Sequence, residues 1–132
     1  MYTNFSNGDK IKGVGVDITD ISRFERLGEQ KKITLRDKIL TGTEKELFSS
    51  RGESYKALAV FFCVKEAVSK AFGTGFNEMF FTDIELSYDN LGKPMVSLSP
   101  LATRLAKEKG ITSLEVSISH EERYVIAYVV AS

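Results

Sequence analysis

Residues 66–75 contain side chains that could together hold a metal ion and phosphate groups. Glu66 supplies a carboxylate, Lys70 an ammonium group, and Gly73-Thr74-Gly75 a segment of small residues. Carboxylates bind hard cations such as Mg²⁺, and a lysine offsets the charge of a phosphate. The two glycines allow close backbone approach and positive φ. This combination favours the chemistry of a divalent metal and a phosphorylated ligand.

A long helix must position these groups, and the sequence predicts one from about Glu53 to a stop at Gly73. At the helical period one face carries a mostly apolar stripe: Tyr55, Leu58, Ala59, Phe62, Glu66 and Ser69. A carboxylate on a buried face needs a cation, a metal or hydrogen-bond donors. Lys70 lies one turn beyond Glu66. The alternative interpretation is an ordinary surface ion pair on a helix that Gly73 merely caps.

Composition indicates one globular domain over residues 11–132, after a flexible lead over residues 1–10. Eighteen basic and eighteen acidic residues cancel, so no general attraction to nucleic acid or to anionic membranes is expected. No apolar run approaches the roughly 18 residues of a membrane span, and the first ten residues are too polar for a signal peptide. The expected location is therefore cytoplasmic.

The charges are unevenly distributed. Between Arg23 and Lys38 there are six basic and three acidic residues, whereas residues 77–92 carry four acidic and no basic residues. The basic segment suggests an acidic partner, or else a solvated helix face. The single cysteine, Cys63, lies in the most apolar part of the long helix and is expected to be a buried, inert thiol.

Asp17 comes near the end of a predicted strand, Ile11–Ile18, in which Gly13 and Gly15 require a close neighbour. The other elements follow from caps, turns and alternation. They are a short helix capped by Thr19 or Asp20, helices over Thr34–Leu40 and after a Thr43–Glu46 capping box, strands Phe80–Tyr88 and Pro94–Leu98, a helix from Ser99-Pro100 to Gly110, and strands Leu114–Ser119 and Tyr124–Val130. Helices interleaved with antiparallel hairpins predict the α+β class.

Six segments occur in this order along the chain: Gly13-Val14-Gly15-Val16-Asp17-Ile18, Ile39-Leu40-Thr41, the run Lys65 to Gly75, Asp83-Ile84-Glu85, Gly92-Lys93-Pro94 and Val116-Ser117-Ile118-Ser119-His120. Together they resemble the holo-[acyl-carrier-protein] synthases, the small bacterial 4′-phosphopantetheinyl transferases. The resemblance covers almost the whole chain after residue 10. No single segment is decisive, but their joint occurrence is highly specific.

The resemblance implies a 4′-phosphopantetheinyl transferase fold, with a small antiparallel sheet packed on one long helix plus short helices. It implies transfer of the 4′-phosphopantetheine group from coenzyme A to a serine of apo-acyl carrier protein, which releases adenosine 3′,5′-bisphosphate. The implied cofactor is Mg²⁺. The implied assembly is a homotrimer with active sites between adjacent subunits.

The same resemblance implies roles for individual residues. Asp17 and Glu66 are the implied metal ligands and, with Lys70, the catalytic residues. The implied coenzyme A contacts are Lys70, Gly73, Thr74, Gly75, Lys93, Pro94, Ser119 and His120. Without the resemblance, His120 would be interpreted as a surface turn residue. A metal-linked water is the favoured general base for the carrier serine, with Asp17 or Glu66 acting directly as alternatives.

One position departs from the family. Phe61 stands where members often carry an arginine for the 3′-phosphate of coenzyme A, and Lys56 or Lys65 could substitute. Carrier-protein docking is assigned to Arg23 first, and to Arg26 and Lys38 next. Two other functions remain open, a non-catalytic module that binds coenzyme A or the carrier protein and a structural oligomer subunit.

Overall fold

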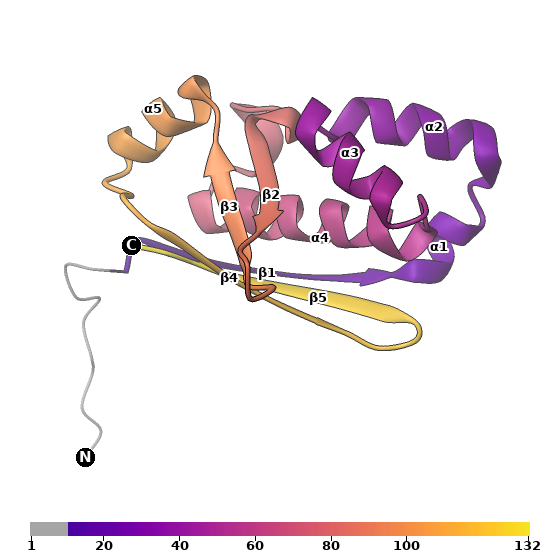
Figure 1. Cartoon of the computed structure of the whole chain (residues 1–132). Coiled ribbons are helices and arrows are strands. Elements are labelled where there is room, and N and C mark those ends of the chain that lie inside the picture. The colour runs from indigo at the N-terminus through magenta and orange to yellow at the C-terminus, as the bar shows by residue number, and fades with distance from the viewer. Residues whose placement is uncertain (1–10) are drawn as a thin grey trace, which may run out of the picture.

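The computed structural model describes residues 11–132 (Figure 1), so the expected flexible lead over residues 1–10 lies outside the described residues. The elements in chain order are β1 (Gly13–Asp20), α1 (Ile21–Glu25), α2 (Gly28–Ile39), α3 (Gly42–Ser50), α4 (Tyr55–Phe72), short 3₁₀ turns at Gly75–Asn77 and Phe81–Asp83, β2 (Ile84–Tyr88), β3 (Pro94–Leu98), α5 (Pro100–Glu108), β4 (Leu114–His120) and β5 (Tyr124–Ala131). The predicted α+β class is confirmed.

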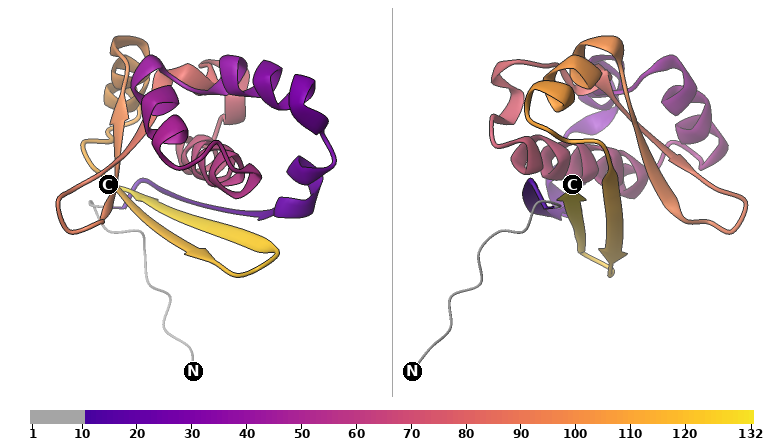
Figure 2. Two further views of the ribbon diagram at one scale, coloured as in Figure 1. Left: turned by 45° about the vertical axis from the view of Figure 1, so that its right-hand side comes forward. Right: turned by 90° about the vertical axis from the view of Figure 1, so that its left-hand side faces the viewer.

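Helix α4 forms the centre of the fold, between the sheet that contains β1 and the helices α2 and α3 (Figures 1 and 2). Its N-cap is Ser54, whose hydroxyl accepts a hydrogen bond from the Ala57 amide at 3.0 Å. Its predicted end at Gly73 is confirmed, since Gly73 adopts the left-handed conformation with φ of 80°. Because α4 is covered on several sides, its buried surface is wider than the single predicted stripe.

The strands form two antiparallel groups. One is a three-stranded sheet in the order β1-β5-β4, and the other is the separate β2–β3 hairpin. In the three-stranded sheet Asp17 of β1 lies opposite Ala127 of β5, which lies opposite Ile118 of β4. β1 and β4 are therefore the two edges of this sheet. No helix within residues 11–132 is long and apolar enough to cross a bilayer.

The two glycines of β1 pack directly against α4. A Cβ atom added to Gly13 would overlap the carbonyl oxygen of Ala71, and one added to Gly15 would overlap that of Ala67. The close neighbour expected from the sequence is therefore the α4 backbone. Since alternate strand residues share a face, Asp17 also points toward α4.

Several predicted boundaries are wrong. β1 spans Gly13–Asp20 rather than Ile11–Ile18, so Asp17 lies within the strand and not near its end. α2 is twelve residues long rather than the short helix expected over Thr34–Leu40. β2 begins at Ile84 rather than Phe80, because residues 81–83 form a 3₁₀ turn whose Asp83 carboxylate accepts the Phe80 amide at 2.7 Å.

The capping box of α3 is formed by Thr41 and Glu44, not by Thr43 and Glu46. The Glu44 carboxylate accepts the Thr41 amide at 2.9 Å, and the Thr41 hydroxyl accepts the Glu44 amide at 3.2 Å. Glu44 is also fully buried beside Lys65 of α4, with 2.6 Å between Glu44 Oε1 and Lys65 Nζ. This long-range contact selects the earlier of two equivalent Thr-x-x-Glu patterns.

Candidate active site

Asp17, Glu66 and Lys70 lie together where β1 crosses α4. Lys70 Nζ donates to Asp17 Oδ1 at 3.1 Å and to the Val16 carbonyl oxygen at 3.0 Å. Glu66 is half-buried, and burial raises the pKa of its carboxyl group. The charge of Asp17 raises that pKa further, while Lys70 and Arg23 oppose the shift. The fold therefore places the carboxylates of Asp17 and Glu66 close enough for their charges to interact, beside the ammonium group of Lys70.

This donor set fits magnesium. Within residues 11–132 no cluster of three or more histidine, cysteine, aspartate or glutamate side chains is arranged to hold a metal ion. Magnesium commonly takes one or two protein carboxylates and completes its shell with water and substrate phosphates. The ammonium group of Lys70 on Asp17 Oδ1 also shows that a cation is accommodated next to this carboxylate. The assignment of Asp17 and Glu66 as metal ligands stays a prediction.

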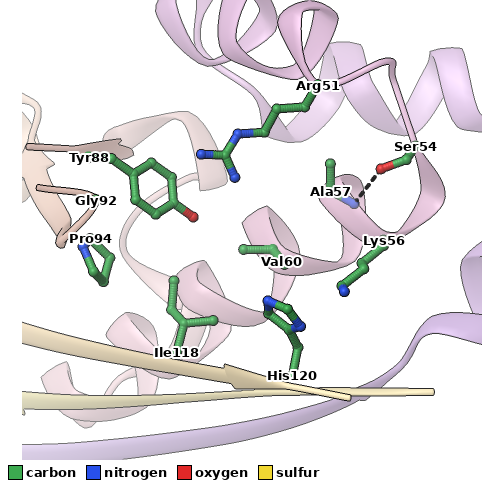
Figure 3. Close-up of a pocket in the computed structure, with 10 residues that line it drawn as sticks. All are labelled: Arg51, Ser54, Lys56, Ala57, Val60, Tyr88, Gly92, Pro94, Ile118 and His120. Carbon is green, nitrogen blue, oxygen red and sulfur yellow. Dashed lines mark hydrogen bonds between the residues drawn. The ribbon is translucent and has the colours of Figure 1, made fainter. Parts of the chain in front are cut away.

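A second group of candidate residues lines a cleft of about 490 Å³ on the β4 side of the molecule (Figure 3). His120, at the end of β4, points into this cleft together with Lys56 from the first turn of α4 and Arg51 from the loop before it. Pro94 and Ile118 add apolar surface. Three nitrogen-bearing side chains beside an apolar wall are suited to an anionic ligand that also has apolar surface.

Arg51 and Tyr88 form one wall of the cleft. The guanidinium carbon of Arg51 lies 4.5 Å from the centre of the Tyr88 ring, within the range of a cation–π contact. Burial raises the pKa of the Tyr88 hydroxyl, and the charge of Arg51 opposes that shift. The contact holds the Arg51 side chain at the cleft (Figure 3). The sequence analysis did not identify either residue, although Arg51 comes just before the predicted start of the long helix.

Some predicted nucleotide contacts lie outside this cleft. Lys93 forms an ion pair with Glu115 at 3.3 Å on the surface. Ser119 lies on the opposite face of β4 from His120, because successive strand residues point to opposite sides. The Gly73-Thr74-Gly75 segment follows α4 on the side of Lys70, and Gly75 also has a positive φ, of 62°.

The predicted site residues therefore form two separate groups in one chain. Asp17, Glu66 and Lys70 lie at the β1 edge of the sheet, whereas His120 lies at the β4 edge with β5 between them. The two groups therefore lie on the two edge strands of one sheet, separated by β5.

The structure excludes one of the two lysines that could replace the missing arginine. Phe61 is only 2% exposed and packs edge-to-face on Phe48, with 6.5 Å between ring centres. Lys65 is fully buried, and its ammonium group donates to the carbonyl oxygens of Ile39 and Phe81 as well as to Glu44. Lys65 as a phosphate ligand is therefore wrong, because a ligand cannot reach it. Lys56 lines the cleft.

The basic residues proposed for docking are exposed. Arg23, on α1, lies 5.9 Å from the centre of the Phe62 ring and close enough to Glu66 to affect its pKa. Arg26, the C-cap of α1, and Lys38, on α2, are also exposed. Arg23 is therefore the one of the three that adjoins the metal site.

Two further residues complete the description of β1 and its neighbour. Thr19, left open as a helix cap, instead donates its hydroxyl to Asp17, and Asp20 is the N-cap of α1. Cys63 is buried as expected, and burial raises the pKa of its thiol to about 12. An inert thiol at this position is consistent with both observations.

Comparison with known proteins identifies the family of this chain. The family model of the 4′-phosphopantetheinyl transferase superfamily matches residues 13–129. The holo-[acyl-carrier-protein] synthase of Serratia proteamaculans is 41% identical over 91% of this chain and 96% of its own length.

Solved structures show the same fold. The holo-[acyl-carrier-protein] synthase of Neisseria meningitidis has a TM-score of 0.86 at 36% identity, over 92% of this chain and 98% of its own. The Helicobacter pylori enzyme, solved in complex with coenzyme A, has a TM-score of 0.78 at 33% identity, over 90% of this chain and 99% of its own. The chain therefore belongs to the 4′-phosphopantetheinyl transferase superfamily, and it is similar over nearly its full length to holo-[acyl-carrier-protein] synthases.

Proposed function

We propose that the chain is a holo-[acyl-carrier-protein] synthase. In the proposed reaction the serine Oγ of apo-acyl carrier protein forms a bond to the phosphorus that carries the pantetheine arm. The diphosphate bond of coenzyme A breaks, adenosine 3′,5′-bisphosphate leaves, and the serine proton passes to a base. The observation that carries this proposal is the convergence of Asp17, Glu66 and Lys70 at one site in a member of this superfamily.

Asp17 and Glu66 would hold Mg²⁺, which when bound neutralises charge on the diphosphate. Lys70 would bind a phosphate oxygen as a point charge. Its side chain is about half exposed, and within residues 11–132 it is held only by Asp17 and a backbone carbonyl, so it can turn toward a substrate. Gly73, Thr74 and Gly75 would line the coenzyme A groove beyond it.

The adenine nucleotide would occupy the cleft of His120 and Pro94. With Phe61 and Lys65 both buried, Lys56 would hold the 3′-phosphate, and Arg51 adds a guanidinium group to the same cleft. Lys93 and Ser119 do not line this cleft, so they would contact only a part of the nucleotide that extends beyond it.

We also propose that the active site forms between subunits of a homotrimer. The metal site and the cleft lie on opposite edge strands of one sheet, and in the proposed trimer the cleft of one subunit would face the metal site of the next. On β1 and β5 the outer face of that sheet is apolar and exposed, as expected of an oligomer interface: Val14, Val16, Ile18, Tyr124, Ile126 and Tyr128. Sedimentation velocity tests this directly, and a monomer under assay conditions would contradict it.

The proposed cellular location is the cytoplasm. The single cysteine, Cys63, is buried and unpaired, which is compatible with a reducing compartment. The proposed substrates are coenzyme A and an acidic carrier protein, and Arg23, Arg26 and Lys38 would dock the latter.

A mass-shift assay tests the function. Apo-acyl carrier protein mixed with the chain, coenzyme A and Mg²⁺ is expected to gain the mass of one phosphopantetheine group. Chelation of the metal is expected to abolish this increase in mass. If the chain binds coenzyme A without any gain, while a known transferase is active in parallel, the non-catalytic binding module is the correct function.

Lys56 and Arg23 are expected to affect different substrates. Lys56→Gln should raise the KM for coenzyme A about tenfold, because a hydrogen bond to a charged group contributes about 1.5 kcal/mol. Arg23→Gln should instead raise the KM for the carrier protein and leave that for coenzyme A unchanged. Each variant serves as the control for the other in steady-state kinetics. Equal effects of both variants on both KM values would contradict the two assignments.

A further inference from the structure

Thr19 is a buried polar residue directly behind the proposed metal ligand. It lies two positions after Asp17 on β1, so both side chains point to the same face of the strand, toward α4. Thr19 is 1% exposed, and its hydroxyl donates to Asp17 Oδ2 at 2.8 Å. A buried hydroxyl needs a partner, and here that partner is the carboxylate of a proposed ligand.

The two oxygens of the Asp17 carboxylate have different partners. Oδ2 accepts from Thr19, which is fixed in the interior, whereas Oδ1 accepts from Lys70, whose side chain is 51% exposed. The backbone carbonyl of Asp17 is also held, by the Cys63 thiol with 3.3 Å between sulfur and oxygen. Asp17 is thus fixed on its inner side, and Oδ1 is the oxygen left with an exchangeable, cationic partner.

We propose that Thr19 is a positioning residue that makes Asp17 bind its cation through Oδ1 alone and so favours Mg²⁺ over Ca²⁺. This inference rests on the proposed function. Magnesium is small and demands a near-octahedral shell, whereas calcium accepts carboxylates that bind through both oxygens. A hydroxyl that occupies a lone pair of Oδ2 and fixes the plane of the carboxylate opposes the two-oxygen mode. Partners of this kind commonly change metal affinity or activity about 10- to 100-fold when removed.

The test compares Thr19→Val with Thr19→Ser. Valine keeps the shape and removes the hydroxyl, whereas serine keeps the hydroxyl. Calorimetric titration of Mg²⁺ and of Ca²⁺ into the protein saturated with coenzyme A measures both affinities without turnover. Thr19→Val is expected to bind Mg²⁺ about 10- to 100-fold more weakly and Ca²⁺ with a smaller loss, so that the preference for Mg²⁺ falls. Thr19→Ser should retain most of both the affinity and the preference.

Thr41→Val is the matched control. The Thr41 hydroxyl donates to Glu85 Oε2 at 2.7 Å, the same kind of contact at a distance from the metal site. Thr41→Val should lower the melting temperature and leave Mg²⁺ affinity unchanged. If Thr19→Val does not fold, Thr19→Ala carries the same prediction.

The outcomes separate this inference from the proposed function. If the unaltered chain binds Mg²⁺ with coenzyme A but a folded variant without the Thr19 hydroxyl keeps the same Mg²⁺ affinity and preference, the role of Thr19 is overturned. If the Thr19 and Thr41 variants lose Mg²⁺ affinity equally, the effect is a general loss of stability and the role is again overturned. If the unaltered chain neither binds Mg²⁺ nor modifies the carrier protein, the proposed function itself fails.

Discussion

Replacement of Glu66 by glutamine is expected to lower kcat by about a thousandfold or more. A bound metal contributes several kcal/mol of charge stabilisation in the transition state, and about 1.4 kcal/mol corresponds to a factor of ten in rate. Glutamine keeps the size of the side chain but provides a weaker, neutral ligand. The mass-shift assay under single-turnover conditions measures the loss, and Asp17→Asn should produce a similar one.

The stability of Glu66→Gln distinguishes loss of a ligand from loss of the fold. Burial and the charge of Asp17 raise the pKa of the Glu66 carboxyl group, so its charged form is disfavoured when no metal is bound. The metal-free melting temperature should therefore be unchanged or higher, while the rise in melting temperature on adding Mg²⁺ and coenzyme A should disappear. Glu46→Gln, at an exposed position on α3, is the control and should preserve both activity and the rise. A Glu66→Gln enzyme that keeps normal activity would contradict the metal site.

Features encoded by adjacent residues could be predicted from the sequence. Gly73 ends α4 because a left-handed residue is needed there, and Ser99-Pro100 begins α5 because serine caps and proline fits the first turn. The glycines of β1 also indicated a close neighbour, although only the structure identifies it as the backbone of α4. Local stereochemistry was sufficient at each of these positions.

The boundaries that failed depend on contacts between distant residues. The segment Thr41-Gly42-Thr43-Glu44-Lys45-Glu46 contains two overlapping capping patterns of equal local quality. The buried ammonium group of Lys65 selects Glu44, and no pattern within the segment reveals that. Helix α2 was predicted too short because its sequence is polar and shows little apolar periodicity.

The candidate site was only partly predictable, because several of its residues meet through contacts between distant parts of the chain. A carboxylate on an apolar helix face indicated Glu66. Asp17 was identified only through the resemblance to the family. Their meeting with Lys70 depends on the close packing of β1 on α4. The division of the site between opposite sheet edges, and the side chains of Arg51 and Tyr88 in the cleft, depend on tertiary structure alone.

Replacement of Lys65 by methionine is expected to destabilise the fold by about 3–5 kcal/mol, because it leaves the Glu44 carboxylate buried without its cation. Both side chains are fully buried, and burial lowers the pKa of Lys65 against the opposing charge of Glu44. Glu44 also accepts the amides of Thr41 and Leu86, the latter at 2.7 Å, so it cannot move to water without breaking the start of α3 and its contact with β2.

The double variant Lys65→Met/Glu44→Gln tests the electrostatic cause. It removes both charges and keeps an amide oxygen for the Thr41 and Leu86 amides, so it should be more stable than Lys65→Met alone. Lys70→Met is the matched control on the same helix, since its exposed ion pair contributes at most about 1 kcal/mol. Urea unfolding of the unaltered chain, Lys65→Met, the double variant and Lys70→Met measures these differences in stability. If the double variant is no more stable than Lys65→Met, shape rather than charge determines the stability of this contact.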